Sequence, residues 1–509
     1  MQATSGNTLS IWAATIDLPS RPQLREDAQA DVCVVGAGIA GMTTAYLLGR
    51  AGKTVVVLDD GPIGGGMTGR TTAHLVTALD DRYFEMERLH GLEGSRLAAQ
   101  SHADSIDQIE RIVQSEKINC EFERLEGYLF VPPGESKEIL RREIEAANRA
   151  GLTKVELVER APIESYDTGE ALRFPRQAQF HPLKYLSGLA NAIERDGGKI
   201  YEQSHAGTIE GGNKARIETS TGPIVTADAV VVATNTPVND RFAIHTKQAP
   251  YSTYVIGARM PKGSVPKALF WDTPDPYHYV RIETGNDGYD ILICGGEDHK
   301  TGQNDDADVR FAALEQWSRE RFPMLKEIEY SWSGEVMEPV DGLAFIGRNP
   351  LDEDNVFIAT GDSGNGMTHG TIAGMLITDL ILGRKNEWAT LYYPSRKTLR
   401  AAKEFAKENL NVAEQFIDLV IPGEVESAAE VPRGSGAIVR RGLLKIAVYR
   451  DEAGTVHELS ALCRHLGCVV DWNSLEKTWD CPCHGSRYDA TGHVIMGPAN
   501  SDLPPAGDD

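Results

Sequence analysis

A glycine-rich turn between two apolar runs constrains this chain more than any other feature of its sequence. The run Val32–Val35 leads into Gly36-x-Gly38-x-x-Gly41, an amphipathic segment follows, and a second apolar run covers Val55–Leu58. Apolar runs of this length are typical of buried strands, and the segment between them has the periodicity of a helix. The order strand, turn, helix, strand predicts a βαβ unit that binds a dinucleotide.

The residue types at this turn suit a bound pyrophosphate. Glycines let the backbone turn tightly and approach a ligand, and the amides that open the helix, those of Ile39 and Ala40 among them, face the phosphates together with the positive end of the helix dipole. Asp59 ends the second apolar run and is placed to accept hydrogen bonds from a ribose hydroxyl. The alternative is a glycine-rich turn in an ordinary α/β protein. The motif alone leaves FAD and NAD open.

Length, composition and charge narrow the class of protein. A chain of 509 residues with 41% hydrophobic and 25% charged residues is typical of globular proteins and predicts about three domains. The formal net charge of -23 argues against nucleic-acid binding, which needs a basic surface. No apolar run reaches the roughly 20 residues of a membrane span, and no basic segment precedes an apolar core at the N-terminus. We therefore expect no membrane span and a cytoplasmic location.

A second glycine-rich segment, Gly61–Leu75, follows the dinucleotide unit. Its glycines allow close backbone approach to a ligand, and Arg70, Thr71 and Thr72 offer donors to a phosphate or to a flavin ring. A flexible surface loop is the alternative. Much further along, the segment 355–383 has the pattern of a strand, a glycine-rich turn and an apolar helix, which predicts a second place where the backbone approaches a ligand.

The remaining patterns divide the chain into parts. Residues 80–160 have mostly helical periodicity, a helix and a strand follow His181, and alternating runs between 251 and 298 predict antiparallel strands that form a roof over the cofactor. Prolines, glycines and acids then indicate a linker. We predict a loosely ordered lead-in at 1–30 with Trp12 as its anchor, a main domain at 31–410, a helix end and linker at 411–434, and a small domain of short strands at 435–509. Within the main domain, the cofactor-binding parts are expected at about 31–80, 180–240 and 335–390, and the substrate and roof parts at about 81–179 and 241–334.

Two short loops in the last domain carry side chains that bind metals. Cys463-x-His465 lies in CRHLGC and Cys481-x-x-His484 in CPCHGSRYD, so each loop offers one thiolate and one imidazole. This donor set suits zinc or a mixed-ligand iron–sulfur cluster. A zinc finger more often combines CxxC with a distant HxxxH, so the spacing favours the cluster.

Through these two loops the C-terminal domain closely resembles a Rieske domain of the cytochrome bc-complex type. The resemblance implies a [2Fe-2S] cluster in which two cysteines hold one iron and two histidines the other. It also implies a disulfide between Cys468 and Cys483, and hydrogen bonds from the hydroxyls of Ser486 and Tyr488 that raise the reduction potential. A structural zinc site is the alternative. The matched ligands are Cys463, His465, Cys481 and His484.

The main domain resembles the D-amino-acid-oxidase-like (DAO) family of FAD-dependent oxidoreductases, especially the branch fused to a C-terminal Rieske domain. The segments that carry the resemblance are GAGIAG, VVVLDD, TGRTTAH, HPLKYLSGLANAIERDGG, DGLAFIGR and ATGDSGNGMTHG. It implies an α/β, Rossmann-like FAD-binding domain (GR2/DAO type) interleaved with an antiparallel-sheet substrate domain, followed by a small all-β Rieske domain. By this resemblance FAD is bound by Gly36, Gly38, Ile39, Ala40 and Gly41 at the pyrophosphate, Asp59 at the ribose, Arg70, Thr71 and Thr72 along the pyrophosphate and ring, and Gly361, Gly364, Gly366, Met367 and Thr368 near the pyrimidine end of the isoalloxazine.

The resemblance implies an amine or amino acid as substrate, with a hydride moving from the carbon beside nitrogen to the flavin, so no acid–base triad is expected. Tyr277, Tyr279 and Arg281 on a roof strand are candidates for holding a substrate carboxylate, since Arg binds carboxylates bidentately. A salt-bridged surface strand is the alternative. His74 is a candidate for contact with the flavin or covalent attachment to it. His369 is a candidate base, although a hydrogen bond at a helix terminus suits its glycine-rich turn better.

The fusion of a two-electron and a one-electron centre predicts a path from substrate to FAD, to the cluster and to an external one-electron acceptor, or the reverse path from the cluster to the flavin. A second hypothesis is a reductase or electron-transfer module fed by NAD(P)H, and the presence of a single GxGxxG unit counts against it. A redox sensor is a third. A ring hydroxylase would need a mononuclear iron site, for which the sequence offers no suitable spacing of Asp or Glu with two His.

Overall fold

The glycine-rich turn lies where the sequence predicts it, between two strands of a mostly parallel sheet. The computed structural model describes residues 5–240, 243–285, 288–397, 399–419 and 421–507. Val32 pairs with Val55 on one side and with Ala229 on the other, both in parallel register. The main path of the sheet has the order β16-β17-β10-β1-β2-β7. Its strands, with the β8–β9 hairpin attached to β10, are β1 (Ala28–Val35), β2 (Val55–Leu58), β7 (Lys199–Tyr201), β8 (Ala206–Glu210), β9 (Ala215–Thr219), β10 (Ile224–Val232), β16 (Phe345–Arg348) and β17 (Val356–Thr360).

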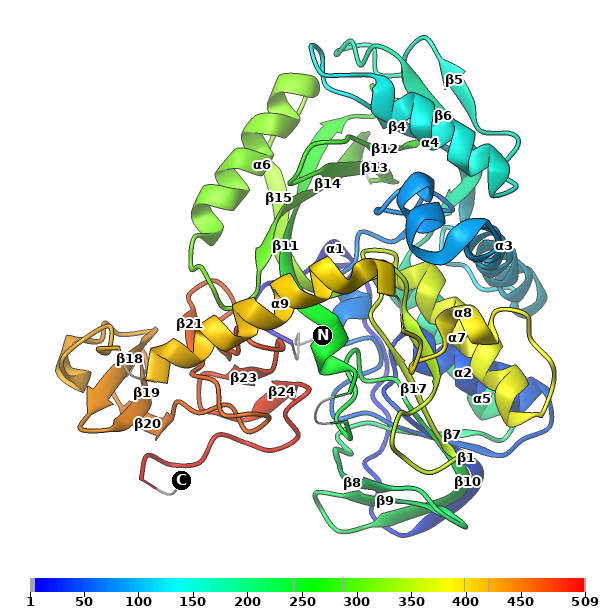
Figure 1. Cartoon of the computed structure of the whole chain (residues 1–509). Coiled ribbons are helices and arrows are strands. Elements are labelled where there is room, and N and C mark those ends of the chain that lie inside the picture. Colours follow the sequence, from blue (N-terminus) through cyan, green and yellow to red (C-terminus); the bar gives the residue numbers. More distant parts are fainter. Residues whose placement is uncertain (1–4, 241–242, 286–287, 398, 420, 508–509) are drawn as a thin grey trace.

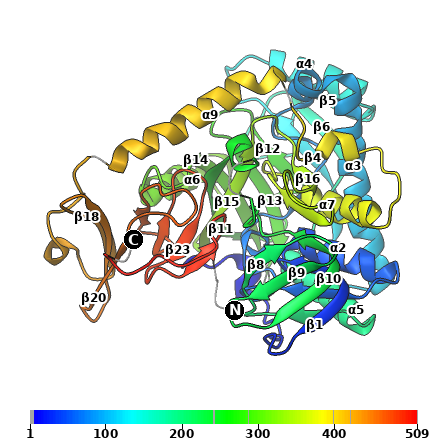
Figure 2. The same ribbon diagram turned by 60° about the horizontal axis from the view of Figure 1, so that its bottom comes forward.

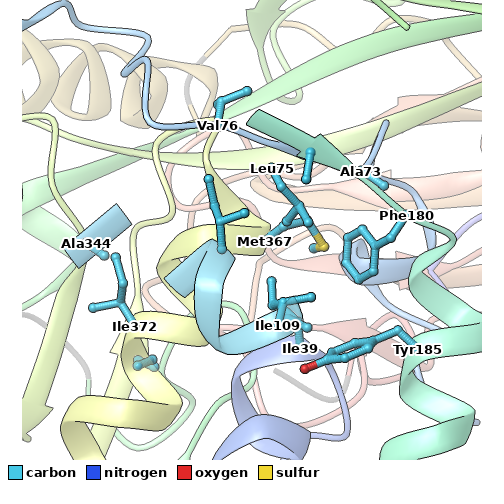
Figure 3. Packing of buried hydrophobic residues seen from close by; sticks show 14 of the residues in the cluster. Ile39, Ala73, Leu75, Val76, Ile109, Phe180, Tyr185, Ala344, Met367 and Ile372 are labelled. Atoms are coloured by element: carbon cyan, nitrogen blue, oxygen red, sulfur yellow. The ribbon is translucent and has the colours of Figure 1, made fainter. Parts of the chain in front are cut away.

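Three helices pack together against this sheet: α2 (Ile39–Arg50), α5 (Pro182–Arg195) and α7 (Gly366–Ile381) (Figure 1). Helix α7 is apolar along its length and lies so close to α2 that a Cβ on Gly374 would stand 2.5 Å from Thr43 Cγ2. Figure 3 shows the core that this approach creates, and its labelled side chains come from segments far apart in the sequence: Ile39, Ala73, Leu75, Val76, Ile109, Phe180, Tyr185, Ala344, Met367 and Ile372.

A second sheet, mostly antiparallel, forms the predicted roof, and residues from 81–179 contribute strands to it as well. Its main path has the order β15-β11-β14-β13-β12-β4-β6-β3, and in Figure 1 it lies above the parallel sheet. The long helix α3 contains a kink at Gly91, where φ is 74°. The elements of this half are β3 (His74–Leu75), α3 (Tyr83–Glu116), β4 (Glu123–Phe130), α4 (Glu138–Arg149), β5 (Glu156–Val158), β6 (Ala171–Gln179), β11 (Gln248–Pro261), β12 (Leu269–Trp271), β13 (His278–Thr284), β14 (Tyr289–Lys300), α6 (Ala307–Arg321) and β15 (Ile328–Pro339).

The N-terminal lead-in is more ordered than the sequence suggests. Helix α1 (Ile11–Ala14) is capped by Ser10, and Trp12 is fully buried, as expected of an anchor. Trp12 donates a hydrogen bond from Nε1 to the carbonyl of Thr71 at 2.6 Å, and Ser10 Oγ donates to the carbonyl of Gly69 at 2.5 Å. The prediction of a loose segment is therefore wrong for these residues, because their partners lie in the second glycine-rich segment and not in the neighbouring sequence.

Helix α9 (Ala402–Gln415) connects the main domain to the C-terminal domain (Figure 2). None of its described side chains is buried. Neither α9 nor any other described helix is long and apolar enough to cross a membrane. Two small sheets follow, in agreement with the predicted domain of short strands, and helix α8 (Ala389–Tyr392) precedes α9. The strands of the small sheets are β18 (Ser435–Arg441), β19 (Leu444–Arg450) and β20 (Val456–Ser460), then β21 (Asp471–Asn473), β22 (Thr478–Asp480), β23 (Arg487–Asp489) and β24 (Val494–Met496).

Candidate functional site

One cavity lies between the carboxyl ends of the parallel strands and the roof sheet. Its lining includes Val35, Leu58 and Thr360 from the ends of three parallel strands, and Thr253 and Tyr279 from the roof. Open α/β sheets bind their ligands at this edge. Of the residues expected to bind FAD, those that line the cavity are Gly36, Gly38, Ile39, Ala40, Asp59, Arg70, Thr71, Thr72, Gly361, Gly364, Gly366 and Met367.

The glycines of the turn have distinct roles. Gly36 has a φ of 106°, and a Cβ there would stand 2.4 Å from the carbonyl oxygen of Ala233. A Cβ on Gly41 would stand 1.9 Å from the carbonyl oxygen of Gly36, so this glycine lets the helix pack on the turn and lies behind the cavity wall. Thr368 also lies behind the wall, where its hydroxyl donates to the carbonyl of Asn365. The turn is thus shaped for a backbone that closely approaches a ligand.

Asp59 lies at the end of β2 on the cavity wall. Its Oδ2 accepts a hydrogen bond from the Ala37 amide at 2.6 Å and its Oδ1 accepts one from the Gly61 amide at 2.8 Å. Burial, together with the neighbouring Asp60, raises the pKa of Asp59 to about 8. Each carboxyl oxygen keeps a second lone pair, so this group can accept a further bond from a sugar hydroxyl.

Arg70 borders the cavity, and its guanidinium is bound by residues of both domains. Its Nη1 lies 2.9 Å from Oε1 of Glu476, which belongs to the C-terminal domain, and both side chains are buried. The same guanidinium donates to the carbonyl of Ser333 and to the hydroxyl of Thr8. The charge of Arg70 joins the two domains, a role that the sequence does not predict.

Arg281 does not line the cavity, although it alternates with Tyr279 on β13, which begins one residue after Tyr277. Its Nη1 donates to three carbonyls, those of Thr72, Ala73 and Phe180, each at 3.1 Å. Its Nη2 is bound to the carboxylate of Glu283. Because the guanidinium is fully buried among these acceptors, it is not placed to hold a substrate carboxylate.

Both candidate histidines lie at the cavity with their ring nitrogens engaged. Nδ1 of His74 lies 3.0 Å from the Thr72 hydroxyl and Nε2 lies 3.3 Å from the Val280 carbonyl. Burial, with Arg281 nearby, lowers the pKa of His74 to about 3. Nδ1 of His369 lies 2.7 Å from the Asp362 carbonyl and its Nε2 lies 3.2 Å from Nε2 of His102. This arrangement suits the hydrogen-bonding role at the helix terminus, not that of a base.

Several carboxylates at the cavity are not predicted from the sequence, and four of them come from different segments. Asp80 follows β3, Asp298 lies on β14, Glu338 ends β15 and Asp362 follows β17. They come from four segments that only the fold brings together. Asp298 and Asp362 end or follow runs that the sequence predicts as strands, and this position is the signal that could have found them. Asp80 and Glu338 leave no such signal.

The two Cys–His loops meet at one end of the C-terminal domain. The thiols of Cys463 and Cys481 hydrogen-bond to each other, and this contact, with a further bond from Tyr488, lowers the pKa of Cys463 to about 6. The Tyr488 hydroxyl lies 3.4 Å from Cys463 Sγ, and the rings of His465 and His484 lie 4.9 Å apart between centroids. Two sulfurs and two imidazoles at one place are the donor set of a Rieske cluster.

Beside these ligands the loops are joined by a disulfide between Cys468 and Cys483, the pairing that the resemblance implied. Its sulfurs lie within 4.8 Å of the Cys481 sulfur. Ser486 is fully buried, and its Oγ accepts a hydrogen bond from the Ala499 amide at 2.9 Å. The disulfide and this bond fix the loops around the place where the cluster would lie.

The histidine edge of these loops faces the main domain. His245, in the 3-10 turn His245–Lys247 before β11, lies with its ring centroid 4.6 Å from that of His465 and 5.8 Å from that of His484. His484 is only 4% exposed as a result. Residues of the C-terminal domain also line the cavity itself, among them Val494 and Asn500. Both candidate cofactor sites therefore meet at one interface.

Comparisons with known proteins agree with this division. Residues 31–380 match the family described as FAD dependent oxidoreductase, and residues 422–506 match the Rieske [2Fe-2S] domain. A Bacillus subtilis protein, named putative Rieske 2Fe-2S iron-sulfur protein YhfW, is 32% identical to this chain. The match covers 96% of this chain and 96% of the length of YhfW. Gamma-glutamylputrescine oxidoreductase of Escherichia coli is 29% identical over 74% of this chain and 91% of its own. Glycine oxidase from Geobacillus kaustophilus superposes with a TM-score of 0.60 at 19% identity, over 73% of this chain and 99% of its own, and this likeness shows the fold alone.

Proposed function

Because the chain belongs to the FAD-dependent oxidoreductase family and ends in a Rieske [2Fe-2S] domain, we propose that it oxidises a C–N bond of an amine or amino acid and passes the electrons from FAD through the Rieske cluster to an external acceptor. FAD supplies the chemistry of hydride acceptance from the carbon beside nitrogen, and the cluster supplies one-electron transfer. The protein's own residues bind, orient and enclose these groups.

The cavity fits FAD on the chemistry of its lining. Gly36 and Gly38 leave the backbone open at the helix N-terminus, where the dipole favours a pyrophosphate. Asp59 offers acceptors for the ribose at the carboxyl end of β2, next to the turn. Toward the roof, Thr72 and Gly364 border the part of the cavity that an isoalloxazine ring would fill. The ring would there be shielded from water by the roof strands above it.

The observation that carries the proposal is the contact between His245 and the two histidines of the Rieske loops. From His245 a series of polar contacts leads back to the cavity. Its Nδ1 lies 3.4 Å from the Thr236 hydroxyl, and the Gln248 amide donates to that hydroxyl at 3.3 Å and to the Thr360 hydroxyl at 3.1 Å. Thr360 lines the cavity. This series offers a short route for electrons between the two sites.

The outer side of the cluster site is open to an external acceptor. His465 is partly exposed, and Arg464 beside it is exposed. His484, in contrast, is enclosed at the interface. Both histidine rings lie against His245 on the buried side, and the loop that carries His465 also reaches the surface. Electrons that arrive through the interface can leave through this loop.

Anaerobic mixing with amines and amino acids tests the proposal. We expect flavin absorbance to bleach first and the cluster absorbance to change afterwards. In a Cys481→Ser variant, which removes a cluster ligand, the flavin should still bleach. Bleaching by NADPH and not by amines would favour a reductase, and an absence of bleaching by either would favour a sensor. Cluster reduction ahead of flavin reduction would contradict the proposed order.

A further inference from the structure

The wall of the cavity under the roof sheet is aromatic on one side. Tyr277 and Tyr279 point to the cavity, and their ring centroids lie 5.3 Å apart. A Cβ on Gly295 would stand 2.3 Å from the Tyr279 ring, so the ring lies flat over this glycine of the neighbouring strand. The Tyr279 hydroxyl is held 2.8 Å from the Thr253 hydroxyl. These contacts fix two aromatic faces next to the space that a substrate would occupy.

Carboxylates complete this part of the wall. Asp80 accepts a hydrogen bond from the Tyr277 hydroxyl at 2.8 Å and lies against Gly364, where a Cβ would be 1.9 Å from Asp80 Oδ2. Asp298 lines the same cavity, and its buried Oδ1 has no hydrogen-bond partner among the described residues. The charges of both carboxylates act on both tyrosines and help to raise their pKa well above the usual value, although burial is the main cause.

Among the described residues, no cation that lines the cavity is free to pair with these carboxylates. Arg82 acts on Asp80 from outside the cavity, where its guanidinium donates to the backbone carbonyls of Leu79, Asp80 and Asp272. In the described part of the chain, Arg70 is the single Lys or Arg that lines the cavity, and Glu476 binds its guanidinium. Arg281 lies outside the cavity, bound by Glu283 and backbone carbonyls. A buried carboxylate oxygen without a donor is costly, and its natural partner is a charged donor brought by a ligand. Aromatic faces stabilise cations as well.

From this wall we infer that the substrate is an aliphatic amine that binds as a cation and has no carboxylate beside the reacting carbon. The ammonium group is held by Asp298 and Asp80 against the faces of Tyr277 and Tyr279. An α-amino acid is disfavoured, because its carboxylate would enter a space lined by carboxylates with no free guanidinium to pair it. The inference rests on the proposed function, since it names the class of substrate for that same cavity.

Two ions with the same tert-butyl group test the charge preference without turnover. tert-Butylammonium has no C–H on the carbon beside nitrogen and so cannot be oxidised there, and pivalate carries a carboxylate in place of the ammonium group. In the FAD-loaded, full-length protein we expect tert-butylammonium to perturb the flavin absorbance and pivalate to leave it unchanged. Binding of pivalate at equal or lower concentration would overturn the inference.

Asp298→Asn removes the charge and keeps the shape of the side chain. We expect it to weaken binding of tert-butylammonium by about tenfold or more, the loss of one charge-assisted bond. Asp308→Asn, an exposed change of the same charge on α6, should leave binding unchanged. Flavin and cluster absorbance of each variant report whether it is folded. If Asp298→Asn does not fold, Asp80→Asn serves as the second test. Unchanged affinity in a folded variant would overturn the assignment of that carboxylate.

A matched pair of oxidisable compounds separates this inference from the proposed function. Pentylamine and norleucine differ by the α-carboxylate. We expect pentylamine to bleach the flavin faster than norleucine. Faster bleaching by norleucine would leave the proposed function standing and overturn the inference. If no amine or amino acid bleaches the flavin, the proposed function fails. The titration with tert-butylammonium and pivalate still decides the charge preference in that case.

Discussion

The cofactor turn and the domain interface are built in opposite ways. The turn is a continuous stretch in which Gly36, the helix amides and Asp59 follow one another along the chain. The interface joins residues hundreds of positions apart, such as Arg70 with Glu476 and His245 with His465. A local motif shapes the cavity, whereas long-range contacts join the two domains, and the proposed electron route depends on those contacts. We expect this difference between the two regions to show in four experiments.

The largest expected effect belongs to the turn. Gly36→Ala places a Cβ at a φ of 106° and 2.4 Å from the Ala233 carbonyl oxygen, so we expect purified protein with little or no flavin. The matched control is Gly52→Ala, where φ is also positive at 85° but nothing lies within 4 Å. It should keep its flavin at a stability cost of about 1 kcal/mol. Cluster absorbance reports folding in both. A full flavin content in Gly36→Ala would contradict the role of the turn.

The interface salt bridge comes next. Glu476→Gln leaves the Arg70 guanidinium buried without a carboxylate, and breaking a buried pair in this way costs about 3–5 kcal/mol. Burial alone would raise the pKa of Glu476, but the charges of Arg70 and Arg487 lower it below its usual value. This direction agrees with an ionised pair. Denaturant unfolding of the loaded protein measures the loss. The control Glu458→Gln removes a solvent-exposed partner of Arg441 and should change stability little. Equal losses would show that the buried pair does not hold the domains.

A smaller effect is expected at the histidine contact. His245→Ala removes the ring that lies against both Rieske histidines, so electron transfer from flavin to cluster should slow severalfold. His245→Phe keeps a ring there and should slow it less. The electron paramagnetic resonance signal of the reduced cluster should also shift, because the surroundings of its histidine ligands change. His457→Ala, in a histidine that stacks on Tyr449 within the Rieske domain, is the control. Unchanged kinetics and signal in His245→Ala would remove this residue from the route.

A fourth effect is a dependence on pH. Burial raises the pKa of Asp298 to about 7; Asp80 and Asp275 also raise it, whereas a hydrogen bond with Thr253 and the charge of His278 lower it. Below that pH the carboxyl is neutral, so affinity for tert-butylammonium, which stays protonated in this range, should fall by up to about tenfold for each pH unit. Above it, affinity should level off. The Asp298→Asn variant should lose this dependence. A wild-type affinity that is flat across pH 7 would contradict the assignment.

The same contrast explains what the sequence could predict. The βαβ unit and the two Cys–His loops are short-range patterns, and the sheet, the turn and the disulfide of Cys468 with Cys483 were expected from them. The sequence predicts Arg281 in the substrate site because it lies on a roof strand and arginine binds carboxylates bidentately, yet carbonyls from other segments bind it. Side-chain periodicity tells which face of a strand a residue lies on, not how far the cavity extends along that face.

The interface was beyond prediction for the same reason. Nothing around His245 distinguishes it from any other histidine before a strand, and its role follows only from the way the Rieske loops lie on the main domain. Asp80 and Asp298 were missed because they come from different segments and meet only in the folded chain. Residues whose function depends on a second domain or on a shared cavity leave no local pattern.

Flash photoreduction of the flavin tests the central claim most directly. A light pulse reduces the flavin in the anaerobic full-length protein, and the cluster absorbance is followed at two protein concentrations. We predict that the cluster becomes reduced at a rate that does not change with concentration, because the electrons cross the His245 interface within one chain. A cluster that stays oxidised, or a rate that rises in proportion to protein concentration, would contradict the account.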